Sequence, residues 1–356
     1  MIYLLIGIVS VVLLVDISLF VLWKDDELVN STNAEKKVSI LIAARNEASN
    51  IETCLESLIH QEYPIKLMQI LVGDDQSEDN TFEIAIEKLK GYDNSKVIRI
   101  DKNISHQKGK ANVLAQLAQQ ATGDVYYITD ADMQLPPSWV KTMLNCSDGA
   151  GIVTGVTYVA GSNNQSLDWV FAIGMTKVLN DLGQPVTTMG NNMMVTKEAY
   201  HAVGGYEYIP FSLTEDFELF KRVRNKGYSA VQLFNPHVLG KTKPISGFID
   251  LLNQRKRWMK GAVQLPWPIV LLLFFQALYF PALILLTYYN LEMGLTLMAV
   301  KILFQSLFIL RCLNSLGLKY TFWQLINYEF YSIIVSMGSA LYYLLPTKVS
   351  WKGRKY

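Results

Sequence analysis

Two aspartates with a single residue between them end an apolar stretch of the chain. Asp130 and Asp132 follow the run Val125 to Thr129 in the sequence VYYITDAD. In an extended backbone alternate residues share a face, so the two carboxylates are expected to lie together. At about 4 Å and an effective dielectric near 20, like charges repel by roughly 4 kcal/mol. A divalent cation would turn this repulsion into an attraction, so the pair is a candidate metal site.

Polar side chains also follow two earlier runs that are typical of buried strands, at residues 38–44 and 69–72. These side chains are Asn46, Glu47, Asp74, Asp75 and Asp79. An ordinary solvated turn would explain any one of the acids, because Asp and Asn are common in turns. Acids after three strands instead favour a common site, since ligands bind parallel sheets at the carboxyl ends of the strands.

Helical and extended patterns alternate through this part of the chain. Apolar residues recur at helical spacing in 48–59, 82–89 and 110–123, and KVIRID at 96–101 predicts a further strand. The alternation predicts an α/β fold, with a mostly parallel sheet and helices on both faces. The motifs G-x-G-x-x-G and G-x-x-x-x-G-K-[ST] are absent, which disfavours a Rossmann dehydrogenase and a P-loop enzyme.

Apolar stretches that are long enough to span a bilayer flank this α/β segment. Residues 1–23 contain one charge, Asp16, and we interpret them as a transmembrane anchor, followed by a polar linker at 24–37. A secretory signal peptide is the alternative, but the start is not basic and no small-residue cleavage site precedes Lys24. Residues 268–346 predict a C-terminal membrane region of about three segments.

The remaining boundaries predict a catalytic domain at 38–244, a basic amphipathic interfacial segment at 245–267 and a basic tail at 347–356. Six basic residues precede the second membrane segment against one acid, Asp250. They are Lys241, Lys243, Arg255, Lys256, Arg257 and Lys260. Positive charge at membrane ends marks the cytosolic side, although contact with anionic lipid headgroups would explain the same band. The three cysteines show neither metal-ligand spacing nor an even count, which fits a reducing cytosol.

Several short motifs occur in an order that resembles one known family. They are LIAARNEASNIETCLESL, VGDDQSED, GKANVL, TDAD, GGYEY, TEDFEL and QRKRW, between residues 38 and 261. This set resembles a family 2 glycosyltransferase of the GT-A fold. It looks most like the membrane-embedded branch that includes ceramide glucosyltransferases and the cellulose, chitin and hyaluronan synthases. The ending WKGRKY also looks like tails in that branch.

The resemblance implies roles on the side of the sugar donor. Asp75 would hydrogen-bond the nucleotide base, and Ala44, Asn46 and Glu47 would line the same pocket. Lys110 would lie near the nucleotide diphosphate or the sugar. The implied donor is a nucleotide sugar, with uridine diphosphate the commonest nucleotide in this branch.

The resemblance also assigns the aspartate pair. Asp130 and Asp132 would hold the nucleotide and its Mg²⁺ or Mn²⁺. Hard oxygen ligands suit these ions, which keep part of their coordination shell for water and diphosphate oxygens. The metal would stabilise the charge that grows on the departing nucleotide.

A further acid and a basic motif complete the implied site. Asp216, in TED, would be the general base that takes the acceptor proton. The alternative is that Glu215 and Asp216 act as N-cap and first-turn acids of a helix. Gln254, Arg257 and Trp258 match the Q-x-x-R-W motif, in which Arg clamps diphosphate and the indole stacks on a sugar. A basic, aromatic interfacial helix is the alternative for this motif.

We interpret the chain as an inverting glycosyltransferase that moves a sugar from a nucleotide sugar, such as a UDP-sugar, to a lipid or lipid-linked acceptor at the cytosolic membrane face. Membrane lipids are expected partners, and nucleic acid is not. The predicted location is the plasma (inner) membrane of a bacterium, with the catalytic domain in the cytosol.

Three other functions compete with this interpretation. A processive polysaccharide synthase of the cellulose, chitin, hyaluronan or poly-N-acetylglucosamine type would share the TED and QRKRW motifs. A phosphatase of the haloacid dehalogenase type also uses two aspartates after a strand, but DADMQ lacks the Thr or Val expected after the second aspartate. A non-catalytic membrane scaffold that retains the fold is the third alternative, and the intact acids argue against it.

The membrane topology contains a conflict. Three full crossings after a cytosolic domain would place the tail outside, yet Lys348, Lys352, Arg354 and Lys355 favour the cytosol. We therefore expect a cytosolic tail and a re-entrant or interfacial segment at 322–346.

Overall fold

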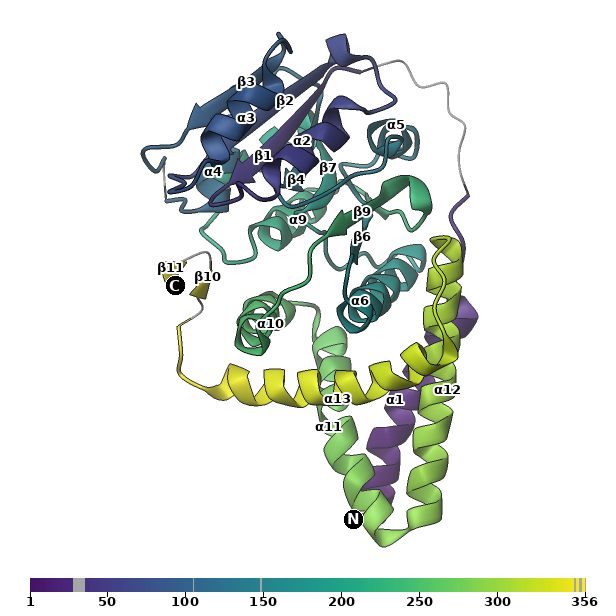
Figure 1. Cartoon of the computed structure of the whole chain (residues 1–356). Helices are drawn as coiled ribbons and strands as arrows, with labels where there is room; N and C mark the ends of the chain where they lie inside the picture. Colours follow the sequence, from purple (N-terminus) through teal and green to yellow (C-terminus); the bar gives the residue numbers. More distant parts are fainter. Residues whose placement is uncertain (28–35, 105, 148, 349, 352–353, 356) are drawn as a thin grey trace. The chain divides into compact units, whose positions relative to one another are not determined.

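The computed structural model describes residues 1–27, 36–104, 106–147, 149–348, 350–351 and 354–355 (Figure 1). They form two compact units. The helical unit comprises residues 1–25, 161–178 and 244–356, and the sheet unit comprises residues 26–160 and 179–243. Residues 28–35 of the predicted linker and residues 349, 352, 353 and 356 of the predicted tail lie outside the described part.

The sheet unit is built around one sheet, which has seven strands within the described residues. Its strand order is β3-β2-β1-β4-β7-β5-β8. Its strands are β1 (Val38–Ala44), β2 (Met68–Asp74), β3 (Ser95–Arg99), β4 (Val125–Asp130), β5 (Ile152–Thr154), β7 (Asn192–Thr196) and β8 (Ala230–Gln232). Strand β7 runs antiparallel to β4 and β5, and the other neighbours are parallel. Strands β6 (Val156–Val159) and β9 (Leu239–Thr242) form a separate parallel pair.

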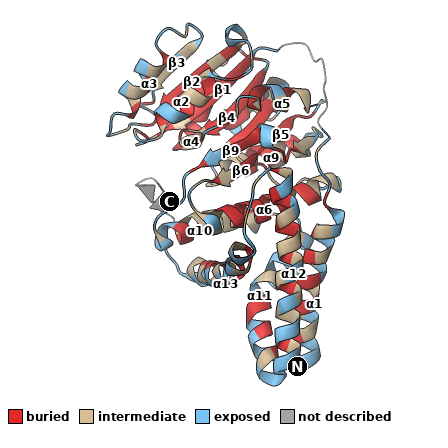
Figure 2. Ribbon diagram, turned by 45° about the vertical axis from the view of Figure 1, so that its right-hand side comes forward, coloured by how far each residue is buried: buried red, intermediate tan, exposed pale blue. Residues whose placement is uncertain are grey.

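The first strands of the sheet are joined by helices. Helix α2 (Ile51–Ile59) follows β1, α3 (Thr81–Leu89) follows β2, and α4 (Lys110–Ala118) follows β3. Right-handed crossovers in this strand order place α2 and α3 on one face and α4 on the other. Figure 2 shows the buried residues concentrated along the strands, which explains their continuous apolar runs. The predicted mostly parallel sheet with helices on both faces is confirmed.

Shorter helices complete the sheet unit. They are α5 (Trp139–Asn145), α7 (Lys197–Ala202), α8 (Gly205–Tyr208) and α9 (Glu215–Asn225). The acids in the first turn of α9 and the basic residues in its last turn both suit the helix dipole.

Six helices make up most of the helical unit in the part of the chain that the structure describes. They are α1 (Ile2–Leu22), α6 (Asn163–Asp181), α10 (Phe248–Ala262), α11 (Trp267–Tyr289), α12 (Leu291–Ser315) and α13 (Phe322–Leu344). Among the described residues, three of them, α1, α11 and α12, are long and apolar enough to cross a membrane. Buried apolar side chains of α1 pack against those of α11, with Val9 and Leu286 both fully buried.

The position of helix α6 differs from the domain boundaries expected from the sequence. The sequence predicted one uninterrupted catalytic domain over residues 38–244. Residues 161–178 pack with the helical unit. The Phe171 ring lies 5.7 Å from Phe308 of α12, measured between ring centroids. At Gly174 an added Cβ would come within 2.7 Å of the Cys312 sulfur, so the two helices approach closely there. The physical reason for the difference is therefore an apolar face of α6 that is buried by α12.

Helix α13 runs across the direction of α11 and α12 (Figure 1). Its exposed apolar side chains recur at spacings of three and four residues, which places them on one face. They are Phe330, Ile334, Met337, Leu341 and Leu344. The Lys256 ammonium of α10 donates hydrogen bonds to the Leu345 carbonyl at 2.6 Å and to the Thr347 hydroxyl at 2.8 Å, which fastens α10 to the end of α13. The tail then forms a short antiparallel pair, β10 (Ser350–Trp351) with β11 (Arg354–Lys355).

Candidate functional site

Acidic residues end neighbouring strands at the same height in the sheet. The parallel register pairs Ala43 of β1 with Asp130 of β4, and Ala44 of β1 with Asp74 of β2. The strand order reverses at β1, because the chain crosses first to β2 and β3 and then back to β4. Such a reversal opens a crevice at the carboxyl ends of the strands, where α/β proteins bind ligands.

The loops after β1 and β2 are hydrogen-bonded to each other. The Asn46 amide donates to the Ser77 hydroxyl at 3.0 Å, and the Glu78 amide donates to the Asn46 side-chain oxygen at 2.8 Å. Asn46 and Gln76 both have left-handed backbone conformations, with φ of 52° and 58°. Such conformations in residues other than glycine are uncommon and concentrate at functional sites. The hydrogen-bonded loops after β1 and β2 therefore form one border of the crevice.

Three of the predicted pocket residues lie at this edge and are buried. Asp75 is 7% exposed and Glu47 is 6% exposed. The Asp75 amide donates to the Ala44 carbonyl at 2.8 Å, and the Asn50 side chain donates to the Glu47 carboxylate at 2.6 Å. The Ala44 side chain is buried in the strand. The structure thus brings Ala44, Glu47 and Asp75 together with the exposed Asn46 at the end of β1.

Two other acids of the β2 loop differ in their surroundings. One oxygen of Asp79 accepts from the amide and the hydroxyl of Thr81, and the other accepts from the Ala48 amide at 3.1 Å. Desolvation of the carboxylate acts to raise the pKa of Asp79, but these hydrogen bonds together outweigh it and hold the pKa below its usual value. Asp79 therefore organises the start of α3. Asp74 is 2% exposed, and its Oδ1 has no hydrogen-bond partner among the described residues.

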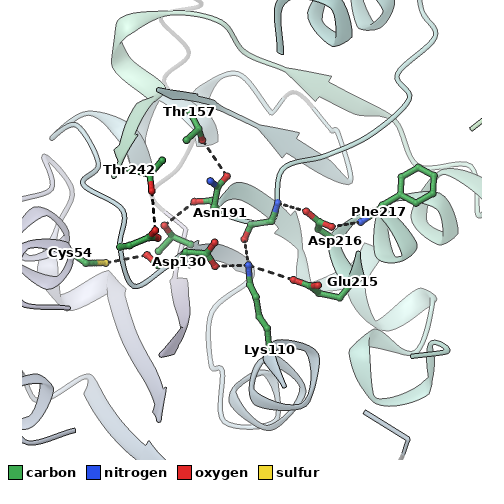
Figure 3. Close-up of polar contacts among 12 residues, drawn as sticks. Cys54, Lys110, Asp130, Thr157, Asn191, Glu215, Asp216, Phe217 and Thr242 are labelled. Atoms are coloured by element: carbon green, nitrogen blue, oxygen red, sulfur yellow. Dashed lines mark hydrogen bonds and ion pairs between the residues drawn. The ribbon is translucent and has the colours of Figure 1, made fainter. Parts of the chain in front are cut away.

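Lys110 is the centre of a charged cluster in the sheet unit (Figure 3). Its ammonium lies 2.5 Å from Oδ1 of Asp130 and 3.5 Å from Oε1 of Glu215, and it donates to the Gly190 carbonyl at 3.0 Å. Burial of the ammonium would lower the pKa of Lys110, but the Asp130 and Glu215 carboxylates outweigh this effect and raise it. Lys110 is therefore a permanent positive charge beside the end of β4.

Asp216 lies next to this cluster and is fixed through both of its oxygens. Oδ2 accepts from the Gly190 amide at 2.8 Å, and Oδ1 accepts from the Phe217 amide at 2.8 Å. Thr214 occupies the N-cap position of α9, and Asp216 lies in the first turn of the helix. An added Cβ at Gly190 would come within 2.8 Å of the Asp216 Cβ, so only glycine lets the loop approach this closely. The half-buried carboxylate is thus both a first-turn acid and an oriented group in the site.

A buried phenol completes this part of the site. Tyr206 is fully buried, and its hydroxyl has no hydrogen-bond partner among the described residues. Burial raises the pKa of Tyr206, and the nearby Glu215 and Asp216 charges raise it further. The phenol therefore stays protonated, as a hydrogen-bond donor close to the two acids.

The two aspartates of the D-x-D motif have different partners. Asp130 is paired with Lys110, whereas Oδ2 of Asp132 accepts from the Thr242 hydroxyl at 2.9 Å. The Cys54 thiol donates to the Asp130 carbonyl at 3.5 Å. No group of three or more His, Cys, Asp or Glu side chains that could hold a metal ion by itself occurs among the described residues. The hard carboxylate oxygens of Asp130 and Asp132 nevertheless fit Mg²⁺ or Mn²⁺, ions that take much of their shell from water and phosphate.

The three predicted residues of the Q-x-x-R-W motif lie on α10, in the helical unit, and not in the unit that carries the acids. Trp258 packs edge-on against Trp169 of α6, with ring centroids 5.2 Å apart. The Arg255 guanidinium lies 4.5 Å from the centre of the Trp258 ring and pairs with the Asp168 carboxylate. The indole of Trp258 is therefore held by neighbours from α6 and α10.

Several contributors were not recognised from the sequence. Gly190 and Thr242 carry no charge and show no diagnostic spacing, and Tyr206 lies in the GGYEY motif without an assigned role. Only the fold places these three residues beside the acids. Glu215 was expected only as an acid at the start of a helix, and its contact with Lys110 was not foreseen. The MGNN sequence before β7 was the available signal for Gly190, because glycine followed by two asparagines is typical of a tight loop.

Comparison with known proteins is consistent with this arrangement. The family described as "Glycosyl transferase family 2" matches residues 39–206, and the family described as "Glycosyl transferase family group 2" matches residues 126–345. A beta-monoglucosyldiacylglycerol synthase from Trichormus variabilis is 26% identical over 235 residues, which is 64% of this chain and 49% of the relative. A poly-beta-1,6-N-acetyl-D-glucosamine synthase from Staphylococcus aureus is 27% identical over 239 residues, 63% of this chain and 54% of the relative. The chain thus spans about half the length of these relatives.

One solved structure shares the fold over most of the chain. A mannosyltransferase from Pyrobaculum calidifontis, solved in complex with GDP-Man and Mn²⁺, superimposes with a TM-score of 0.59 at 14% sequence identity. The match covers 95% of this chain and 99% of that protein. At this identity the likeness establishes the fold.

Proposed function

The chain belongs to glycosyl transferase family group 2, and on this basis we propose that it transfers a sugar from a nucleotide sugar to a lipid or lipid-linked acceptor, with inversion at the anomeric carbon. The observation that carries the proposal is the cluster of Lys110, Asp130 and Glu215 at the switch point of the sheet, with Asp216 fixed beside it. It combines a permanent cation, an acidic strand end and an oriented carboxylate, as sugar transfer from a diphosphate requires.

The donor would occupy the crevice at the ends of β1, β2 and β4. Asn46, Glu47 and Asp75 would contact the nucleoside, together with Asp74, whose buried Oδ1 lacks a partner among the described residues. The Lys110 ammonium would face the diphosphate and stabilise the negative charge that grows there as the sugar leaves. The nucleotide sugar of the related mannosyltransferase structure, GDP-Man, supports this donor class, and we propose UDP as the nucleotide here.

The reaction itself is a single displacement. The acceptor oxygen attacks the anomeric carbon while the bond from that carbon to the phosphate oxygen breaks, and the nucleoside diphosphate leaves with the electron pair. Asp216 takes the proton of the acceptor hydroxyl as a general base. Its carboxylate needs no reorientation, because the Gly190 and Phe217 amides already fix both oxygens.

A divalent cation fits the same site. Asp130 and Asp132 would hold Mg²⁺ or Mn²⁺, and the bound ion would neutralise diphosphate charge. The Lys110 ammonium now pairs with Asp130 and supplies one positive charge at this position. The Mn²⁺ in the related mannosyltransferase structure supports a metal of this class.

The acceptor is proposed to be a lipid because the catalytic fold is joined to apolar helices. With α1, α11 and α12 as spans, two crossings follow the sheet unit, so the tail returns to the side on which that unit lies. The exposed apolar face of α13 then suits the membrane interface. The basic residues of 241–260 favour the cytosol for this side, where nucleotide sugars are made. The glycolipid synthase among the relatives supports the acceptor class.

A processive polysaccharide synthase is the second candidate, favoured by the similarity to the poly-N-acetylglucosamine synthase. Both candidates are tested by giving the purified full chain a panel of radiolabelled nucleotide sugars and a membrane lipid extract, with Mg²⁺, Mn²⁺ or a chelator. Labelled lipid that enters organic solvent supports the main proposal, and labelled polymer supports the second. No transfer with any donor would favour a non-catalytic scaffold.

The role of the metal site is tested in the same assay by Asp130→Asn and Asp132→Asn. Each variant is expected to bind donor more weakly and to lose the dependence on divalent ions while it remains folded. Unchanged donor affinity of the parent protein in the presence of chelator would contradict the metal role.

A further inference from the structure

Four helices of the helical unit enclose a polar cluster that the proposed reaction does not use. Its members are Asp16 of α1, Tyr279 of α11, Lys301 and Gln305 of α12, and Glu329 of α13. Each of these residues is at most 2% exposed. Three of the four helices are the ones long and apolar enough to cross a membrane, within the described residues. Ionisable side chains at such positions are costly and therefore usually functional.

The contacts in the cluster converge on Lys301. Its ammonium donates to the side-chain oxygen Oε1 of Gln305 at 2.5 Å and to Oε2 of Glu329 at 3.4 Å, and it lies 3.7 Å from Oδ2 of Asp16. The Gln305 amide nitrogen donates to the same Glu329 oxygen at 2.6 Å. The ring centre of Tyr279 lies 5.3 Å from the ammonium. One cation is therefore shared by two carboxyl groups.

The number of charges does not balance if all three groups are ionised. Two carboxylates and one ammonium give a net charge of −1 in a space from which solvent is excluded. Three polar atoms of the cluster also have no hydrogen-bond partner among the described residues: Oδ2 of Asp16, Oε1 of Glu329 and the hydroxyl of Tyr279. An unbalanced charge in such surroundings costs several kcal/mol, and a buried acid usually takes up a proton instead.

We propose that this cluster is a proton-binding site, in which Asp16 and Glu329 together hold one proton. The cluster is then neutral, with one carboxylic acid, one carboxylate and one ammonium. A metal cation is a poorer occupant, because it would stand as a second full charge close to the Lys301 ammonium. A proton instead becomes part of a neutral acid that can donate a hydrogen bond. The site ties α1 and α13 to α12 while the proton is bound.

The proposal is tested by infrared spectroscopy of the full chain in lipid nanodiscs at neutral pH, where a protonated carboxyl group has its own C=O stretching band. Asp16→Asn leaves Glu329 with Lys301, and Glu329→Gln leaves Asp16 with Lys301. Both remaining pairs are neutral without a proton, so either single substitution is expected to remove the band. Lys301→Met leaves two acids without a cation, and the band is expected to become about twofold larger, because both acids then neutralise. Asp93→Asn, an exposed acid of the sheet unit, is the control and leaves the band unchanged.

Two results would overturn the proposal. The first is a band that survives one of the two acid substitutions, because the proton would then belong to a single residue and not to the charge balance. The second concerns the melting temperature of the unaltered protein and its response to Na⁺. The folded cluster retains a proton that an ordinary Asp, with a pKa of about 3.9, loses, so the melting temperature is expected to fall as the pH rises and the proton leaves. Restoration of the melting temperature by Na⁺ at constant ionic strength would identify a cation as the occupant.

Discussion

Each unit of the molecule holds one lysine between two acidic side chains, and the two clusters differ in their access to solvent. The first is Lys110 with Asp130 and Glu215, and the second is Lys301 with Asp16 and Glu329. In the first cluster the Asp130 side chain is 35% exposed, whereas no charged side chain of the second exceeds 2%. Both clusters carry two negative charges against one positive charge if all groups are ionised.

The comparison shows that charge count alone does not define a site. Water and ions can reach the cluster of Lys110, Asp130 and Glu215, so its excess negative charge can attract a cation or a ligand that carries one. The lysine can then exchange one partner for another. Where solvent is excluded, the same excess is removed by a proton. Burial raises the free-energy cost of every unbalanced charge. We therefore expect the sealed cluster, which is Lys301 with Asp16 and Glu329, to control stability. The open cluster, which is Lys110 with Asp130 and Glu215, is expected to control chemistry.

The largest expected effect tests the open cluster as chemistry. Asp216→Asn preserves the size of the side chain and its acceptor oxygen but removes the base. Loss of general-base catalysis is expected to slow transfer by about 10² to 10⁴ fold, or roughly 3 to 5 kcal/mol. Single-turnover transfer and donor affinity measured on the same preparation check this, and donor affinity is expected to change little.

If Asp216 were only a first-turn acid of α9, Asn would cost about 1 kcal/mol of stability or less, and turnover would be nearly normal. That result would move the base elsewhere, and Glu215 would be tested next. Asp93→Asn is the matched control, because this acid is exposed and lies in a turn of the sheet unit.

The next effect compares the two lysines directly. Lys301→Met leaves a buried pair of acids without their cation, and it is expected to lower the free energy of unfolding by about 3 to 5 kcal/mol. Lys110→Met is expected to cost less stability, because Asp130 is partly exposed, but to abolish most donor binding. Thermal unfolding and donor titration of both variants check this, and equal losses of stability would remove the distinction between open and sealed clusters.

The same comparison explains what the sequence revealed. The strands, the helices between them and the acids at the strand ends follow from local sequence patterns. The strands of a parallel sheet are buried on both faces and are therefore apolar, and they end in polar loops. Asp75 and Asp130 were therefore found as candidates, whereas Ala44 and Asp216 were assigned roles only through the resemblance to the family. Asp16 was seen only as the single charge of an apolar segment, and Glu329 was given no role.

What was missed depends on contacts between distant parts of the chain. The pairing of Lys110 with Glu215 joins positions 105 residues apart, and no pattern of spacing predicts it. Lys301 approaches Asp16 across 285 residues, from a different helix. The assignment of 161–178 to the helical unit is similar, since the apolar face of α6 is visible in the sequence but its partner α12 is not. Gly190 was missed because its role is the absence of a side chain.

A smaller effect tests how firmly the site holds its base. An alanine at position 190 would place a Cβ within 2.8 Å of the Asp216 Cβ and 2.9 Å of its Oδ2. The carboxylate must then shift, and a shift of about 1 Å is expected to slow transfer by up to 10² fold. The turnover number should fall more than the donor affinity. Gly7→Ala, where an added Cβ meets nothing within 4 Å, is the control, and normal turnover of Gly190→Ala would show that Asp216 tolerates displacement.

The smallest effect concerns an acid that belongs to neither cluster. Asp79 has no lysine partner in the described contacts and instead accepts hydrogen bonds from Thr81 and Ala48. The pKa of Asp79 is lowered in the folded protein, so its contribution to stability is present above the ordinary pKa of about 3.9 and is lost as the pH falls through the folded value. Asp79→Asn keeps one acceptor oxygen and is expected to cost about 1 kcal/mol at neutral pH. Transfer activity should be unchanged, and the variant should lose less stability than the parent protein between neutral and acid pH. Parallel pH profiles of the two proteins, measured by thermal unfolding, would show that the carboxylate charge adds nothing to the start of α3.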